Sequence, residues 1–269
     1  MADFYVLGNS TRTQMFGCII QTKTKTIVID GGELGDYKQL ADFLYENANS
    51  HVDAWFFTHP HKDHIGAFCN IGRYAPDITV DRLYYRFPTV EDLDKYGGRA
   101  PDEQQCWGET DNWKYAYDVY NFSEGEIFRF DEVAIRVLRV YNPNILENFV
   151  NNSCAVFRIE GAKNSVLILG DIGTEGGDEV MSICPRELLY ADYTQMAHHG
   201  QFGVSREFYE YIKPMRCIWP SPQWLWDNDA GDGFDTGPWA TVRTREWMDE
   251  LGVKTHIIEK DGTQKIDFE

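Results

Sequence analysis

The chain has 269 residues, with 25 Lys and Arg against 43 Asp and Glu, so its formal net charge at pH 7 is −18. Such a negative charge favours solubility and argues against tight general binding to nucleic acids and other polyanions. Because the sequence has no apolar run of membrane-spanning length and no basic start followed by a long apolar core, we expect a cytoplasmic protein without a signal peptide or a membrane partner.

The first part of the chain alternates short apolar runs with an amphipathic stretch. Strand-type runs lie at residues 4–7, 18–22, 26–29 and 54–57, and an amphipathic helix is expected at residues 37–47. Directly after the run that ends at Phe57, residues 58–64 read Thr-His-Pro-His-Lys-Asp-His. A second helix is expected to begin within this segment, at Lys62.

The segment 58–64 places His59, His61, Asp63 and His64 within six positions. Imidazoles and a carboxylate are the ligands that a divalent cation such as zinc prefers. An extended chain keeps His59 and His61 on one side, whereas Asp63 and His64 project from the first turn of the predicted helix. Ligands arranged on one strand-to-helix turn could serve two adjacent ions. The alternative is a surface loop that happens to be rich in histidine.

Two aromatic segments are candidates for the border of a pocket. Residues 88–122 form an insertion-like stretch that is rich in aromatic and acidic residues. This stretch is either a lid whose rings select the substrate, as aromatic cages do for quaternary ammonium groups, or a helix packed on the body through Trp113, Tyr117 and Tyr120. Residues 220–239 combine tryptophans with aspartates and are interpreted as a substrate rim, an acidic cation site or a solvated surface.

The second half again combines strands with a helix. Strands are expected at residues 126–130, 134–140, 154–159 and 165–169, near Cys217 and at residues 256–259, with a helix at residues 175–183. Two mixed sheets packed together, with helices outside, account for this order and give an α+β fold class. Since no linker rich in Pro, Gly or Ser separates the halves, we expect residues 1–269 to form a single domain with the insertion at 88–122.

Four motifs resemble, in order, those of the metallo-β-lactamase fold hydrolases. Residues 59–64 resemble the His-x-His-x-Asp-His signature of that family. The other matches are residues 26–32, 165–171 and 193–200, whose characteristic side chains are Asp30, Asp171, His198 and His199. The resemblance implies a four-layer αββα sandwich of two mixed β-sheets flanked by helices. It also implies a zinc-dependent hydrolase with a binuclear metal site that acts on a small-molecule substrate.

The chain departs from the family pattern at one ligand. The family usually has a histidine between its second and fourth motifs, but the chain has none from Ile65 through Ala197. Asn151, Asn152 and Ser153 stand before the predicted strand at residues 154–159. This substitution and the paired histidines are similar to the branch that contains the hydrolase domain of the DNA-uptake competence proteins and the phosphorylcholine esterases. It leaves one of the two implied metal sites short of a ligand.

The resemblance also assigns roles to the candidate residues. The implied metal ligands are His59, His61, Asp63, His64, Asp171, His198 and His199. The first two histidines hold one ion, the adjacent Asp-His pair holds the other, and Asp171 bridges them. Asp30, Asn152 and Ser153 support the ligands from behind, although an aspartate that merely starts the Gly31-Gly32 turn is the alternative for Asp30. Two zinc ions are expected, with manganese or iron as alternatives.

Such a centre implies hydrolysis by a metal-bound hydroxide. Asp63 and Asp171 are the expected catalytic residues, because they would hold the ions beside a water whose pKa zinc lowers to roughly 7. The resembled branch favours a phosphoester or phosphodiester bond. A carboxylic ester, thioester or lactone hydrolase on the same site is the enzyme alternative, and a non-catalytic metal-binding scaffold protein is the alternative outside the enzymes.

Overall fold

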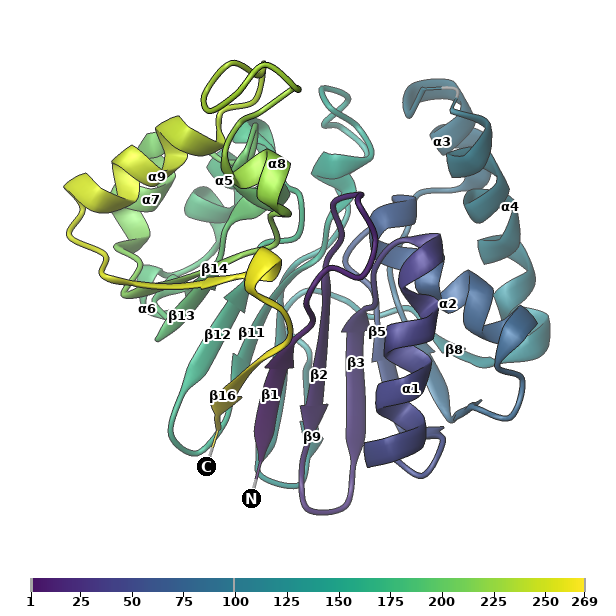
Figure 1. Cartoon of the computed structure of the whole chain (residues 1–269). Helices are drawn as coiled ribbons and strands as arrows, with labels where there is room; N and C mark the ends of the chain where they lie inside the picture. The colour runs from purple at the N-terminus through teal and green to yellow at the C-terminus, as the bar shows by residue number, and fades with distance from the viewer. Residues whose placement is uncertain (1, 99, 269) are drawn as a thin grey trace.

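The structure is a computed structural model that describes residues 2–98 and 100–268. Two large mixed sheets form its centre (Figure 1). The first sheet has the strand order β16, β1, β2, β3, β5, β7 and β8. Its strands are β1 (Asp3–Val6), β2 (Gly17–Gln21), β3 (Thr26–Asp30), β5 (Ala54–Phe56), β7 (Arg82–Tyr84), β8 (Asp118–Tyr120) and β16 (Gln264–Asp267). Pairing is antiparallel from β16 to β3 and parallel from β3 to β8.

The second sheet repeats this plan with the strand order β15, β14, β13, β12, β11, β10 and β9. Its strands are β9 (Ile127–Phe130), β10 (Val133–Arg139), β11 (Val156–Glu160), β12 (Ser165–Ile168), β13 (Tyr193–Gln195), β14 (Arg216–Trp219) and β15 (Thr255–Ile258). Pairing is antiparallel from β9 to β12 and parallel from β12 to β15. A small separate sheet pairs β4 (His51–Val52) with β6 (Thr79–Val80).

Helices cover the outer faces of both sheets. The α-helices are α1 (Tyr37–Asn47), α2 (Lys62–Tyr74), α3 (Val90–Tyr96), α4 (Pro101–Ala116), α5 (Thr174–Ile183), α6 (Arg186–Leu189), α7 (Arg206–Ile212), α8 (Gln223–Trp226) and α9 (Thr241–Glu250). Short 3-10 turns are η1 (Leu34–Asp36), η2 (Asn151–Ser153), η3 (Ala197–Gly200) and η4 (Glu259–Asp261). No helix in the described part of the chain has the length and apolar character needed to cross a membrane.

The alternation of side chains along the strands produces four layers. Inward-facing residues of both sheets, among them Phe56 and Phe157, share one buried cluster between the sheets. The outward-facing Trp55 packs edge-on against Phe68 of α2, with ring centroids 4.7 Å apart, because successive residues of a strand point to opposite faces. The second sheet is buried in the same way under α5, α7 and α9. The predicted α+β sandwich of four layers is therefore confirmed.

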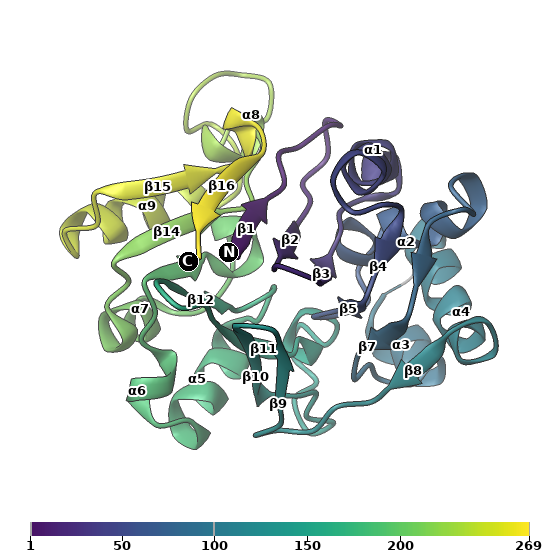
Figure 2. The same ribbon diagram turned by 90° about the horizontal axis from the view of Figure 1, so that it is seen from below.

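The two ends of the chain meet in the first sheet. Strand β16 pairs antiparallel with β1, so that Phe4 lies opposite Ile266. Figure 2 shows both termini side by side at this edge. Sequence analysis predicted β15 but not β16, since Ile266 is the one apolar residue of the four in Gln264–Asp267.

The insertion at 88–122 contains helices α3 and α4 and ends in β8. Trp113 of α4 is buried, with its ring 4.9 Å from that of Phe68, as expected for a helix packed on the body. Tyr120, by contrast, lies in β8 rather than on the helix. The reason is that the chain turns to an extended conformation at Tyr117 (φ −131°, ψ 158°) and continues as a parallel partner of β7.

Candidate metal centre

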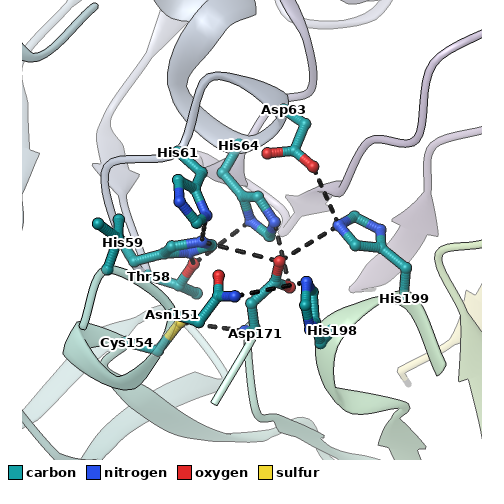
Figure 3. A network of polar contacts seen from close by, with 12 residues as sticks. Thr58, His59, His61, Asp63, His64, Asn151, Cys154, Asp171, His198 and His199 are labelled. Carbon is teal, nitrogen blue, oxygen red and sulfur yellow. Dashed lines mark hydrogen bonds and ion pairs between the residues drawn. The ribbon is translucent and has the colours of Figure 1, made fainter. Parts of the chain in front are cut away.

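The histidine-rich loop leaves the carboxyl end of β5 and enters α2, as the sequence predicts. His61 is the extended residue before the helix (φ −66°, ψ 145°), and its carbonyl oxygen accepts hydrogen bonds from the backbone N–H groups of His64 and Ile65. The extended stretch holds His59 and His61, and the first helical turn holds Asp63 and His64. Figure 3 shows these side chains converging with Asp171 and His199.

The structure gathers the predicted ligands into two groups. Asp63, His64, Asp171 and His199 form one group, and His59, His61 and Asp171 form the other. Within each group, the candidate ligand atoms all lie within 4.8 Å of one another. Asp171 belongs to both groups and is 1% exposed. Its position directly after the buried strand β12 therefore places one carboxylate between two clusters of imidazoles.

The distances fit ligands around a cation. His199 Nε2 lies 3.2 Å from Asp63 Oδ2 and 3.3 Å from Asp171 Oδ2, and His64 Nε2 lies 3.2 Å from Asp171 Oδ1. Ligands at the corners of a tetrahedron with bonds of about 2.1 Å are about 3.4 Å apart. Nevertheless, His64 Nε2, His199 Nε2 and Asp171 Oδ1 are buried and make no hydrogen bond of normal geometry within the described residues. Buried polar atoms that converge without hydrogen bonds are what a divalent ion requires.

Partners of the other ring nitrogens orient the imidazoles. His199 Nδ1 donates to the Pro220 carbonyl oxygen at 2.7 Å, and His64 Nδ1 donates to Asp30 Oδ2 at 2.7 Å. Thr58 Oγ1 donates to the same Asp30 oxygen at 2.7 Å and accepts from His59 Nδ1 at 3.1 Å. In each case the hydrogen bond keeps a proton on Nδ1 and so makes Nε2 the nitrogen that would bind an ion, as metal-binding histidines require.

Asp30 therefore connects to both groups. It is fully buried, it adopts a left-handed conformation (φ 55°), and its Oδ1 accepts from the Thr58 backbone N–H at 2.7 Å. One carboxylate orients His64 directly and His59 through Thr58. The supporting role of Asp30 stays a prediction, and Thr58, which the sequence analysis did not single out, takes part in the same contacts.

The histidines of the two groups differ in the direction of their pKa shifts. Burial lowers the pKa of His199, but Asp171 and Asp63 outweigh burial and raise it to about 10. Burial raises the pKa of Asp171, but His199 and His64 outweigh it and hold the pKa well below its usual range. For His61, burial is the largest effect and lowers the pKa to about 4. Without an ion, protons on the imidazoles balance the carboxylates of the first group, and a bound cation would replace those protons.

The paired histidines lie in the turn η3, and the turn separates them. His198 (φ 50°) and His199 (φ 56°) both adopt left-handed conformations, which are uncommon for residues other than glycine and tend to occur at functional sites. His199 joins the group of Asp63, whereas His198 lies in neither group of the described residues. His198 Nδ1 donates to the Phe202 carbonyl oxygen at 3.2 Å, and its Nε2 lies 3.4 Å from Asn151 Nδ2. His198 as a metal ligand stays a prediction.

Asn152 and Ser153, which the sequence analysis expected to support the ligands, lie in the turn η2. Asn152 Oδ1 accepts from the backbone N–H groups of Gly173 at 2.9 Å and Gly176 at 3.1 Å, and so fixes the loop that follows Asp171. Ser153 Oγ donates to the Val150 carbonyl oxygen at 2.7 Å, within the turn itself. Both contacts are structural, and neither side chain belongs to the two groups of candidate ligands among the described residues.

Two further contacts to the ligands were missed by the sequence analysis. Gln14 Nε2, from the loop between β1 and β2, donates to Asp63 Oδ2 at 2.9 Å. The backbone N–H of Asp171 donates to Cys154 Sγ at 3.0 Å. Neither Gln14 nor Cys154 belongs to a recognisable motif, and only the packing of distant segments brings them to the centre.

A cavity of about 410 Å³ opens beside the ligand groups. Its lining consists of Arg12, Thr13, Gln14, Glu33, His61, Lys62, Asp63, Glu103, Asp171, His198 and Trp224. Glu103 belongs to α4, and Trp224 lies in the segment 220–239, where its Nε1 donates to the Arg12 carbonyl oxygen at 2.8 Å. Both aromatic segments singled out in the sequence thus contribute a residue to the lining of the cavity.

No family model matches the chain. Among solved structures, a metallo-β-lactamase fold protein, YhfI from Bacillus subtilis, matches 98% of this chain and 99% of its own length with a TM-score of 0.57 and 14% identity. The chain has the metallo-β-lactamase fold. A new diphosphatase from the PhnP family matches 100% of the chain and 98% of its own with a TM-score of 0.53 and 14% identity.

Two other similarities are partial. A mutant of CmlA β-hydroxylase matches 98% of this chain but 53% of its own, with a TM-score of 0.53 and 14% identity. In sequence, the chain is 24% identical over 182 residues to ComE operon protein 3 of Bacillus subtilis (strain 168). That match covers 67% of this chain and only 21% of the relative, so the chain corresponds to about a fifth of that protein. The match is consistent with the predicted resemblance to DNA-uptake competence proteins.

Proposed function

We propose that the protein is a metal-dependent hydrolase that cleaves a phosphoester or phosphodiester bond of a small-molecule substrate. The observation that carries the proposal is the geometry of Asp171, which joins two groups of candidate ligands beside one open cavity. Ligand groups that share a carboxylate suit a two-metal site, in which both the attacking and the leaving oxygen of a displacement are stabilised.

The residues of the chain provide the binding and orientation that such a reaction needs. Asp63 and Asp171 supply the negative charge that holds divalent cations, and Asp30 keeps the Nε2 atoms of His64 and His59 directed inward. A divalent ion held there would lower the pKa of bound water towards neutrality. Arg12 lines the cavity, where its guanidinium could contact the anionic oxygens of a phosphoryl group.

The preference for phosphoryl chemistry rests on two supports. The first is the resemblance of the sequence motifs to the branch with phosphorylcholine esterases. The second is the similarity in fold to a structure described as a diphosphatase. Since the CmlA β-hydroxylase mutant is equally similar in fold, the fold alone does not select the reaction. The choice of phosphoryl chemistry over other hydrolytic reactions therefore depends on the residues of the site and requires a direct test.

The test uses the full chain, stripped of metal and reconstituted with zinc, manganese or iron in separate samples. We expect cleavage of a chromogenic phosphodiester or a phosphorylcholine ester well above the metal-free control, and poor turnover of β-lactams. Turnover of lactones or thioesters without phosphoester cleavage would replace this proposal with the alternative of a carboxylic ester, thioester or lactone hydrolase. Inactivity towards all of these classes, in protein that holds metal, would favour a metal-binding scaffold.

Zinc is proposed as the metal, with two ions bound, because imidazoles dominate the donor set. Manganese and iron remain the alternatives that the same test distinguishes.

A further inference from the structure

The amide oxygen of Asn151 is an unexplained polar atom beside the metal centre. Asn151 is 5% exposed, and its Oδ1 makes no hydrogen bond within the described residues. A buried acceptor without a partner costs about 1 to 3 kcal/mol. Native proteins contain few such atoms, and each one requires a reason. Asn151 was not among the residues that the sequence analysis assigned to the site.

The neighbours of Asn151 determine which way its amide faces. Its Nδ2 donates to Asn148 Oδ1 at 2.9 Å and lies 3.4 Å from His198 Nε2. Because His198 Nδ1 donates to the Phe202 carbonyl oxygen, His198 Nε2 is the acceptor nitrogen of that ring. A reversed amide would place Oδ1 against two acceptors. The hydrogen bonds therefore direct the nitrogen towards His198 and the oxygen to the other side.

The oxygen is directed towards the smaller of the two ligand groups. Figure 3 shows the Asn151 amide between His198 and the pair His59 and His61, with its oxygen turned towards the pair. The group of His59, His61 and Asp171 has three candidate ligands, whereas the group of Asp63 has four. Structural zinc sites have four protein ligands, whereas catalytic sites have three with a water in the fourth position and can expand to five ligands, so the smaller group has room for one further donor.

The turn that carries Asn151 is held rigidly from behind. Arg139 is fully buried, donates from Nη2 to the Asn152 carbonyl oxygen at 2.8 Å and from Nη1 to the Cys154 carbonyl oxygen at 2.6 Å, and pairs with Glu179 at 2.6 Å. A buried arginine that braces the two backbone carbonyls after Asn151 fixes the position of η2. The orientation of the Asn151 side chain is thus preorganised rather than incidental.

We propose that Asn151 Oδ1 is the fourth protein ligand of the ion held by His59, His61 and Asp171. The inference rests on the proposed metal-dependent function and deepens it. An amide oxygen is a harder donor than an imidazole and suits manganese better, relative to zinc, than an imidazole does. This group therefore binds zinc more weakly than does the group of Asp63, His64 and His199. It also prefers zinc over manganese by a smaller factor.

The test measures metal binding independently of turnover. Stripped full-length protein is titrated with zinc or manganese alone in competition with a chelator, and bound metal is counted by elemental analysis. Loss of a residue that only supports a metal ligand lowers metal affinity by about 10- to 100-fold. Asn151→Ala is expected to lower the affinity for the weaker ion by at least this factor. Asn151→Asp, which keeps an oxygen donor, should retain that ion. Asn151→His should raise the ratio of zinc to manganese affinity.

Two controls separate ligation from a general loss of structure. Asn144→Ala makes the same substitution at an exposed position on the same segment and should leave both affinities unchanged. Retention of the tighter ion by Asn151→Ala shows that the fold persists.

A metal-loaded structure with anomalous scattering gives the decisive geometry. We expect Asn151 Oδ1 within about 2.0 to 2.2 Å of an ion. An ion at His59, His61 and Asp171 that lies beyond bonding distance of Asn151, or an Asn151→Ala variant with unchanged binding of both ions, would overturn the proposal. Wild-type protein that binds no metal would overturn both this inference and the proposed function. Correct ligation without hydrolysis of phosphoesters would overturn only the proposed reaction.

Discussion

Replacing Asp30 with Asn should weaken metal binding, although Asp30 is not itself a proposed metal ligand. The Asp30 carboxylate makes three hydrogen bonds of 2.7 Å, with the Thr58 backbone N–H, Thr58 Oγ1 and His64 Nδ1. Asn has nearly the same shape, but one carboxylate oxygen becomes an NH₂ group. When the remaining oxygen accepts from the Thr58 N–H, the NH₂ group faces the Nδ1–H of His64, and two donors oppose each other.

The imidazole can relieve this opposition only by moving its proton. With the proton on Nε2, His64 Nδ1 accepts from the new NH₂ group, but the nitrogen that lies 3.2 Å from Asp171 Oδ1 then has no lone pair for an ion. Partners of ligating histidines typically contribute about 10- to 100-fold to metal affinity. Loss of one hydrogen bond to a charged group costs about 1.5 to 3 kcal/mol of stability. We therefore expect Asp30→Asn to lose both metal affinity and free energy of unfolding, each by the amount given above.

The assay combines chelator competition, for the affinity of the tighter ion, with urea unfolding of the metal-free protein. Asp94→Asn makes the same substitution on an exposed residue of α3, and it should change neither quantity. If Asp30→Asn lost stability but bound metal like the wild type, Asp30 would only start the turn at Gly31 and Gly32. The argument from the His64 tautomer would then be refuted.

Three further predictions follow from the ligand geometry and from one buried carboxylate. Mild chelation should remove the ion of His59 and His61 before that of the four-residue group, so elemental analysis should pass through one ion per chain; release of both ions together would contradict this order. His199→Ala should lose the tighter ion because its Nε2 lies 3.2 Å from Asp63 and 3.3 Å from Asp171; retention of both ions by this variant would contradict the assignment. Burial raises the pKa of Glu259 well above its ordinary value of 4.5, and its oxygens make no hydrogen bond of normal geometry within the described residues. Because this raised pKa favours the protonated form in the fold, the contribution of Glu259 to stability is greatest below pH 4.5 and falls as the pH rises towards the folded pKa. Glu259→Gln should therefore stabilise the protein by about 1 to 3 kcal/mol at pH 7 and weaken this pH dependence, as measured by urea unfolding from pH 4 to 8; a destabilised variant at pH 7 would contradict the argument.

Local spacing predicted the part of the site that lies on one continuous segment. The order of extended chain, Pro60 and helix start fixes the directions of His59, His61, Asp63 and His64 with little help from the rest of the fold. The apolar strand before Asp171 likewise indicated a buried carboxylate. Two sets of strands in the sequence predicted two sheets, because the period of apolar residues reports burial directly.

The tertiary structure decided which residues complete the site. Neighbouring histidines have the same chemistry in the sequence, and only the left-handed turn at η3 directs His199 inwards and His198 towards Asn151. Gln14 reaches Asp63 across 49 positions of the chain, a contact that no local pattern encodes. Strand β16 could be recognised only through its partner β1. The orientation of the Asn151 amide depends on Asn148, on the same segment, and on His198, which is distant in the sequence. The sequence alone therefore could not indicate Asn151 Oδ1 as a candidate ligand.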